Sequence, residues 1–92
     1  MEDSWDDIGY VISSQYRVEV LKYLVTGPAT PSKIASEVGI SITHVSRAIQ
    51  NLRERSLVDL LVPEERRKGR VYGATEKGET LWNRIEAENL VE

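Results

Sequence analysis

The sequence predicts a small, mainly α-helical fold that carries one β-hairpin, in the order helix, helix, helix, strand, strand, helix. Three observations support this order. Apolar residues recur at helical spacing in three successive capped segments between residues 14 and 56. Two short β-compatible runs then flank a charged loop within residues 57–74. A last segment with helical periodicity covers residues 76–90.

Length and composition indicate one globular domain over residues 1–92. A hydrophobic fraction of 40% and a charged fraction of 29% are typical of soluble proteins. Because there is no cysteine, disulfides, thiolate zinc sites and thiol nucleophiles are excluded. The start of the chain lacks the features of a signal peptide, and no apolar run approaches the ~20 residues that span a bilayer. We therefore expect a cytoplasmic protein with no membrane partner.

The chain is predicted to begin with an acidic N-terminal arm over residues 1–13. Its apolar residues, such as Trp5 and Ile8, offer some contact with the rest of the fold. We expect at least the first few residues to be mobile. Charges near a terminus are usually hydrated, so the pair Asp6 and Asp7 is expected to be solvated.

The first helix is predicted over residues 14–26. Three of its apolar residues share one stripe, Val18, Leu21 and Val25, and Val20 and Leu24 widen it. Ser13 or Ser14 is the predicted N-cap. The helix ends at Gly27, which permits a left-handed cap and is followed by Pro28.

The second helix is predicted over residues 31–38, with Thr30 as its N-cap. Pro31 suits the first helical position, where its missing N–H has no partner to lose. The buried face consists of three residues: Ile34, Ala35 and Val38. Gly39 ends this helix, which is only two turns long and must be stabilised by packing.

The third helix is predicted over residues 42–56, with Ser41 as its N-cap. Its buried face repeats at helical spacing: Val45, Ala48, Ile49 and Leu52. A short helix, a tight turn containing Gly39 and a longer helix with a polar outer face together form a helix-turn-helix pattern.

The segment 57–74 is predicted to form a β-hairpin. Apolar runs within "LVDLLV" and "RVYGAT" supply the strands, and the charged loop "PEERRKG" joins them. Four basic residues lie at or beside the tip: Arg66, Arg67, Lys68 and Arg70. Gly69 would let the tip turn tightly.

The last helix is predicted over residues 76–90, capped by Thr75. Gly78 in its first turns costs about 1 kcal/mol relative to alanine, so we expect a compensating reason such as close packing. Trp82 has two interpretations, packing in the core or contact with a second copy of the chain.

The outer face of the third helix carries side chains that can hydrogen-bond to base edges or phosphates: Ser41, Thr43, His44, Ser46, Arg47, Gln50 and Asn51. An ordinary solvated face, which is the alternative, would be dominated by glutamate and lysine. Arg47 lies near the pole opposite the buried stripe and is the strongest candidate for a bond to guanine or phosphate. The single histidine, His44, is interpreted as a surface group or DNA contact rather than a metal ligand.

Charge is distributed unevenly along the chain. The formal net charge is −3, but residues 31–78 hold nine basic and six acidic residues, while both flanking segments are acidic. Local potential steers a polyanion more than total charge does. The basic hairpin tip could be a merely solvated loop, but beside a polar helix face it is expected to contact phosphate or the minor groove.

These motifs resemble the winged helix-turn-helix of prokaryotic transcription regulators, with similarity to small MarR-like and ArsR-like proteins. "TPSKIASEVGIS" is similar to the supporting helix and turn, and "HVSRAIQNLRERSLV" to the recognition helix that leads into the wing. "RKGRVYGATEKGETL" resembles the return strand of the wing and the start of the final helix. The resemblance covers residues 16–82.

The resemblance implies a sequence-specific, double-stranded DNA-binding transcription regulator that acts as a homodimer through its N-terminal and C-terminal segments. The helix over 42–56 would enter the major groove. The hairpin over 57–74, called the wing, would contact the adjacent backbone or minor groove. A winged-helix adaptor that docks on transcription or replication machinery without touching DNA is the alternative. No enzyme, metal site or cofactor is predicted, because the chain lacks nucleophile–base pairs, a Gly-rich phosphate loop and metal-ligand clusters.

Overall fold

The structure, a computed structural model, describes residues 4–91. Within this range it contains five α-helices and one two-stranded antiparallel sheet. In chain order these are α1 (Ser4–Ile12), α2 (Gln15–Thr26), α3 (Pro31–Val38), α4 (Ile42–Glu54), β1 (Val58–Leu60), β2 (Tyr72–Ala74) and α5 (Glu76–Ala87). The mainly α fold with a β-hairpin is confirmed. The mobility expected of the first residues concerns positions outside the described range.

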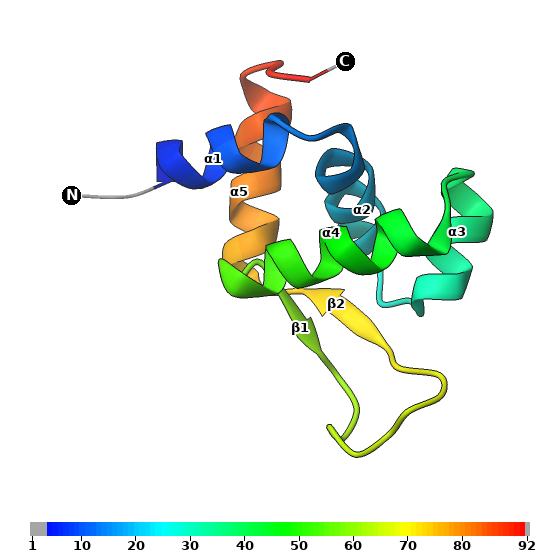
Figure 1. Cartoon of the computed structure of the whole chain (residues 1–92). Helices are drawn as coiled ribbons and strands as arrows, with labels where there is room; N and C mark the ends of the chain where they lie inside the picture. The colour runs from blue at the N-terminus through cyan, green and yellow to red at the C-terminus, as the bar shows by residue number, and fades with distance from the viewer. Residues whose placement is uncertain (1–3, 92) are drawn as a thin grey trace.

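Helix α4 lies across the molecule and packs most extensively against α2. Figure 1 shows α3 beside the N-terminal end of α4, and the hairpin extending from its C-terminal end. Helices α1 and α5 lie on the side away from the hairpin tip. One long side of α4 therefore remains uncovered next to the hairpin. No helix between residues 4 and 91 has the length and apolar character required to cross a bilayer.

Helix α1 is absent from the sequence prediction, which placed an acidic arm at these residues. Ile8 and Val11 are 1% and 0% exposed, and α1 packs against α2 and α5. Helix α1 is short, and unlike the equally short α3 it has no proline at its first position and no glycine after its end to mark its bounds in the sequence. Packing on two neighbouring helices stabilises what would be marginal alone.

The expectation that Asp7 is solvated was wrong. Its carboxylate is buried, with Oδ1 accepting from Nη1 of Arg55 at 3.0 Å and Oδ2 lying 3.2 Å from Nζ of Lys77. The Arg55 guanidinium also lies 4.0 Å over the ring of Tyr10. A buried carboxylate requires such partners, because an unpaired charge is costly away from water. Charge as well as packing therefore joins α1 to the C-terminal end of α4 and to α5.

The predicted N-caps are confirmed. Four hydroxyl groups accept from the backbone N–H three residues ahead, at 3.0–3.3 Å: those of Ser14, Thr30, Ser41 and Thr75. Ser14 rather than Ser13 caps α2, since the Ser13 hydroxyl donates to the carbonyl of Tyr10. Gly39 ends α3 in the left-handed region, with φ of 84°.

Buried residues of all five described helices and of the hairpin form one core. The buried face of α4 is the predicted one: Val45, Ala48, Ile49 and Leu52. Trp82 of α5 is 4% exposed within the chain itself, so core packing is its correct interpretation. Because this face of α4 is buried in the core, the opposite, polar face is exposed to solvent.

The hairpin pairs β1 with β2 in antiparallel register, with Asp59 opposite Gly73. Its strands are shorter than the predicted apolar runs. An additional bridge, which is absent from the prediction, joins Ala29 to Tyr72 through backbone hydrogen bonds of 3.0 and 2.9 Å. This bridge fixes the base of the hairpin beside the start of α3.

The expected reason for a glycine at position 78 is confirmed. A Cβ built on Gly78 would overlap the backbone carbonyl oxygen of Leu57. That same carbonyl accepts from the backbone N–H of Thr75 at 3.0 Å. The start of α5 can approach the backbone of Leu57, just before β1, this closely only without a side chain at position 78.

Candidate nucleic-acid interface

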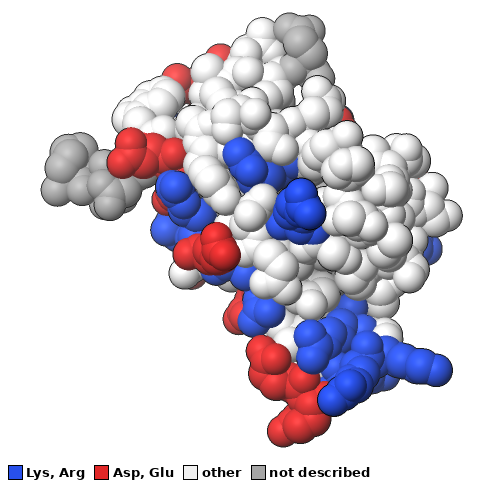
Figure 2. Space-filling model, viewed as in Figure 1, with Lys and Arg blue, Asp and Glu red and all other residues white. Residues whose placement is uncertain are grey.

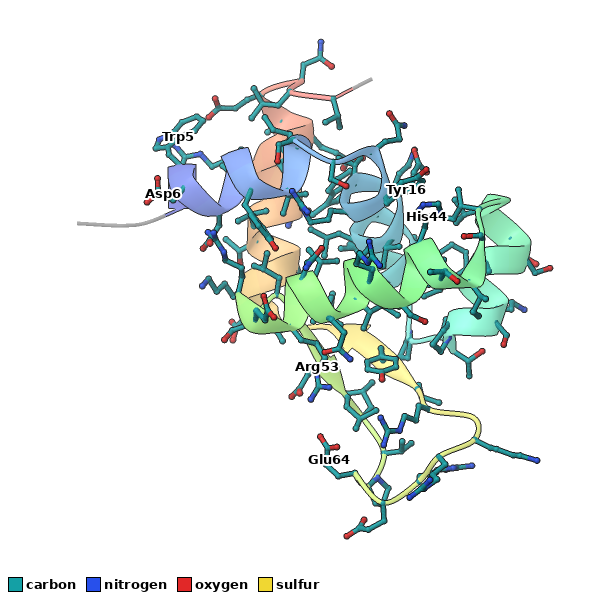
Figure 3. All side chains as sticks on the ribbon, in the orientation of Figure 1. Trp5, Asp6, Tyr16, His44, Arg53 and Glu64 are labelled. Carbon is teal, nitrogen blue, oxygen red and sulfur yellow. The ribbon has the colours of Figure 1, made fainter. Side chains whose placement is uncertain are left out.

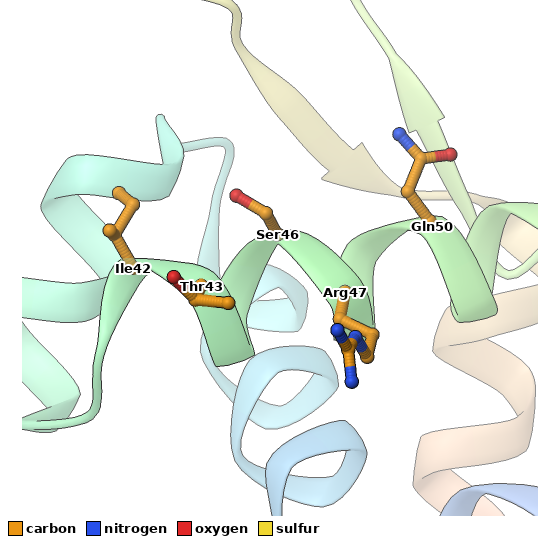
Figure 4. Close-up of a pocket in the computed structure, with 5 residues that line it drawn as sticks. All are labelled: Ile42, Thr43, Ser46, Arg47 and Gln50. Atoms are coloured by element: carbon orange, nitrogen blue, oxygen red, sulfur yellow. The ribbon is translucent and has the colours of Figure 1, made fainter.

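The exposed face of α4 forms one side of the candidate interface. Five residues line a shallow groove along it: Ile42, Thr43, Ser46, Arg47 and Gln50 (Figure 4). The side chains of Thr43, Arg47 and Gln50 make no hydrogen bond or ion pair with the residues that the structure describes. These polar groups are exposed, as predicted, and are free to bond to a partner.

Ser41 and His44 are tied to each other at the start of α4. The Ser41 hydroxyl caps the helix and lies 2.9 Å from Nδ1 of His44. The imidazole stacks on the ring of Tyr16 from α2, with centroids 4.1 Å apart and planes inclined by 15° (Figure 3). This contact fixes the orientation of His44 while leaving it exposed.

Asn51 differs from the other predicted contacts because a neighbouring helix already binds it. Its Oδ1 accepts from Nη1 of Arg17 at 3.3 Å, and the side chain is half-buried. Arg17 in turn donates to the Tyr10 carbonyl at 2.8 Å and lies 4.0 Å over the Tyr10 ring. Asn51 therefore joins α4 to α1 and α2 through its oxygen, while its amide N–H groups can still donate to a partner.

Two aromatic and basic residues beside this face, Tyr16 and Arg17, are absent from the predicted site. Both belong to α2, and only the packing of α2 on α4 brings them next to His44 and Asn51. Only their residue types could have indicated a role in binding, since tyrosine and arginine are common in binding surfaces. Periodicity could not show which face of α4 they would adjoin.

The basic residues of the hairpin tip fall into two groups. Arg70 donates from Nη2 to the carbonyl of Glu64 at 2.7 Å and from Nε to the carbonyl of Arg66. Arg66 donates from Nε to the carbonyl of Lys68 at 3.1 Å. These two arginines fold the loop on itself, with Gly69 at φ of 64° completing the turn.

The side chains of Arg67 and Lys68 form the second group. They make no hydrogen bond or ion pair within the described part of the chain. An ion pair of 3.4 Å between Arg53 and Glu64 links α4 to the same loop (Figure 3). The loop thus presents two unengaged cations from a position that α4 helps to fix.

A second groove runs between α4 and the hairpin. Ten residues line it: Thr30, Pro31, Ser32, Ile42, Ser46, Arg67, Lys68, Gly69, Arg70 and Tyr72. Ile42 and Ser46 also line the first groove, so the two form one continuous surface. Among the described residues no carboxylate lines either groove, but Glu64 and Glu65 line a neighbouring hollow of the tip together with Arg67 and Arg70. Figure 2 shows basic side chains gathered at the tip and acidic ones directly beside them.

We expect Arg70→Gln to loosen the loop over residues 63–69, because the variant loses the two bonds from Arg70 to backbone carbonyls. The ordered conformation of the loop should lose about 1–3 kcal/mol of stability relative to open conformations. Heteronuclear NOE values of the loop amides measure this change. Arg67→Gln removes the same charge without removing a bond, so it should leave these values unchanged. Equal mobility in the two variants would contradict the structural role of Arg70.

The described residues contain no cluster of side chains that could bind a metal ion. Between residues 4 and 91, no group of three or more His, Asp or Glu side chains is placed to hold a metal ion. The surface described above instead combines hydrogen-bonding groups on a helix with positive charge on a neighbouring loop. Its chemistry suits a polyanion with hydrogen-bonding edges.

Comparison with known proteins gives a family and a fold. The family model of the HVO_A0261 N-terminal domain matches residues 5–91. No curated protein sequence matches significantly. Among solved structures, the MarR family regulator NMB1585 from Neisseria meningitidis superposes with a TM-score of 0.73 at 22% identity, covering 92% of this chain and 61% of that one.

Two further structures superpose similarly. The DNA-binding domain of Mb0332 from Mycobacterium bovis, described as homodimeric and possibly of the ArsR family, gives a TM-score of 0.76 at 20% identity, covering 95% of this chain and 79% of that one. A ZitR mutant from Lactococcus lactis gives 0.74 at 21%, covering 84% of this chain and 53% of that one. The chain thus spans about half of ZitR and three fifths of NMB1585. These superpositions confirm the winged helix-turn-helix fold.

Proposed function

The chain belongs to the HVO_A0261 N-terminal domain family, and we propose that it is a sequence-specific, double-stranded DNA-binding transcription regulator. In this proposal α4 enters the major groove and the wing contacts the adjacent backbone or minor groove. The observation that carries the proposal is the pair of joined grooves beside α4 and the hairpin, which are lined by hydroxyl and cationic side chains and by no carboxylate of the described residues.

The exposed face of α4 supports base contacts. The major groove is about 12 Å wide and admits an α-helix, whose outward side chains then meet the base edges. Arg47 and Gln50 lie one turn apart on this face, and neither has to break an internal bond to reach a base. Thr43 and Ser46 are short hydroxyl residues beside them, suited to bases or phosphate oxygens. His44, held by Tyr16, would contact the backbone at the rim.

The wing supports contacts with phosphate. Arg67 and Lys68 are exposed and unengaged within the described residues, so each can neutralise a phosphate. Arg66 and Arg70 retain further N–H groups beyond those bound to the loop. The net charge of −3 does not oppose this binding, because the acidic residues concentrate in the flanking segments.

We also propose that the protein binds DNA as a homodimer through α1 and α5. Trp5 of α1 is 54% exposed, and Arg84 of α5 lies 4.6 Å over its ring. An exposed tryptophan next to an arginine is typical of the residues that dominate protein interfaces. Two-fold symmetry would then favour a palindromic DNA site with half-sites about one helical turn apart.

Selection of bound DNA from a random pool tests the proposal. We expect an enriched palindromic site, whose affinity falls steeply with salt at a log–log slope of about −0.9 for each phosphate contact. Roughly four to six contacts per protomer would make the dependence easy to measure. If no sequence is enriched and no DNA binds even at low salt, the protein is instead an adaptor that docks on another protein.

A further inference from the structure

An exposed isoleucine lies where the two grooves of the polar surface join. Ile42 begins α4, is 47% exposed and lines both grooves. Figure 4 shows its side chain projecting from the first turn of the helix, on the same side as Ser46 and Gln50. Single exposed apolar residues are common on protein surfaces, so what distinguishes Ile42 is its place among the hydroxyl and cationic side chains that line both grooves.

Ile42 contributes neither to the core that the described residues form nor to the apolar contact at the start of α4. The apolar contact that usually fixes the start of a helix joins the residue before the N-cap to the fourth helical residue, here Ile40 and Val45. Ile40 packs against the core and Val45 is fully buried, so this contact does not involve Ile42. Ile42 does not belong to the core cluster or to the residues packed on it within residues 4–91.

The surroundings of Ile42 specify the kind of partner. Arg47 lies on one side of it along α4, and Arg67 and Lys68 lie across the second groove. A partner on this surface must therefore be anionic overall and yet present a small apolar group. A protein ligand for an exposed isoleucine would bring a broader apolar face, which the rim of hydroxyl and cationic residues does not match.

We propose that Ile42 contacts the C5-methyl group of a thymine and makes the protein selective for that base. In the major groove the thymine methyl is the apolar group that base edges present, beside acceptors and donors suited to Arg47 and Gln50. This inference rests on the proposed function, since it requires α4 to lie in the major groove. It adds a base preference that charge and hydrogen bonding alone do not supply.

Replacement of thymine by deoxyuridine tests the inference, because it removes only the methyl group. After a site has been selected, each thymine is replaced in turn and the dissociation constant is measured by fluorescence anisotropy. For the unmodified protein we expect one position in each half-site where deoxyuridine weakens binding roughly threefold to tenfold. Ile42→Ala should bind thymine and deoxyuridine equally there, whereas Ile42→Val should keep most of the preference.

Leu61→Ala is the matched control, since Leu61 is 52% exposed but lines neither groove. It should retain the full preference for thymine. The inference is overturned if deoxyuridine has no effect at any position, or if Ile42→Ala still discriminates as strongly as the unmodified protein. In both cases a selected site would still support the proposed function. If no site can be selected, the proposed function fails and the thymine contact fails with it.

Discussion

Arg47→Ala is expected to weaken binding to the selected DNA site by about 1–3 kcal/mol per half-site, which corresponds to roughly 5-fold to 150-fold. Arg47 lies on the exposed face of α4 without a bond to any described residue. Its guanidinium can therefore bond to a guanine or a phosphate without losing an internal contact. Fluorescence anisotropy on the selected site measures the loss.

A second substitution separates the two kinds of contact. Arg47→Lys keeps the charge but loses the bidentate geometry, so it should preserve a phosphate contact and impair a guanine contact. Lys22→Ala is a suitable control, because Lys22 is exposed on α2 and lines neither groove. All three variants should keep the thermal stability of the unmodified protein, since exposed substitutions usually change stability by less than about 0.5 kcal/mol. Undiminished binding by Arg47→Ala would falsify the assignment of Arg47 as a DNA contact.

Gly78→Ala is expected to lower the free energy of unfolding by about 2–4 kcal/mol. The added methyl would overlap the carbonyl oxygen of Leu57, which is a backbone atom and cannot rotate away as a side chain can. The overlap outweighs the gain of about 1 kcal/mol that alanine brings to a helix interior. In a chain of 92 residues such a loss should lower the melting temperature by about 10 °C or more.

Gly9→Ala makes the same change in a helix where there is room for it. Gly9 lies in α1, and no described atom outside its own helix turn approaches within 4 Å of the position that its Cβ would occupy. We expect this variant to be as stable as the unmodified protein or up to about 1 kcal/mol more stable. Urea denaturation followed by circular dichroism compares the two. Equal stabilities would show that the chain relaxes around the methyl group added at position 78 without cost and that close packing is not the reason for Gly78.

Local signals in the sequence predicted much of the fold. Helix caps depend on residues only three positions apart, and so Thr30, Ser41 and Thr75 could be recognised without any tertiary information. The periodicity of α4 likewise separates a buried face from an exposed one. Thr43 and Arg47 were identified as exposed for this reason.

Features that join distant segments could not be predicted in the same way. The burial of Asp7 depends on Arg55 and Lys77, which lie 48 and 70 positions further along the chain and reach it only after α1 docks. The bridge between Ala29 and Tyr72 similarly requires the hairpin to fold back on the start of α3. Neither contact has a local period or motif.

The candidate site shows the same division. Short-range periodicity and residue type are enough to specify its elements, their caps and the polar composition of α4 and the hairpin tip. The separate roles of its residues depend on the folded arrangement: Arg70 folds the loop, Asn51 is bound by Arg17, and Ile42 stays exposed between two grooves. These roles are absent from the sequence pattern because side-chain partners are set by distances between elements, and packing of the core fixes those distances.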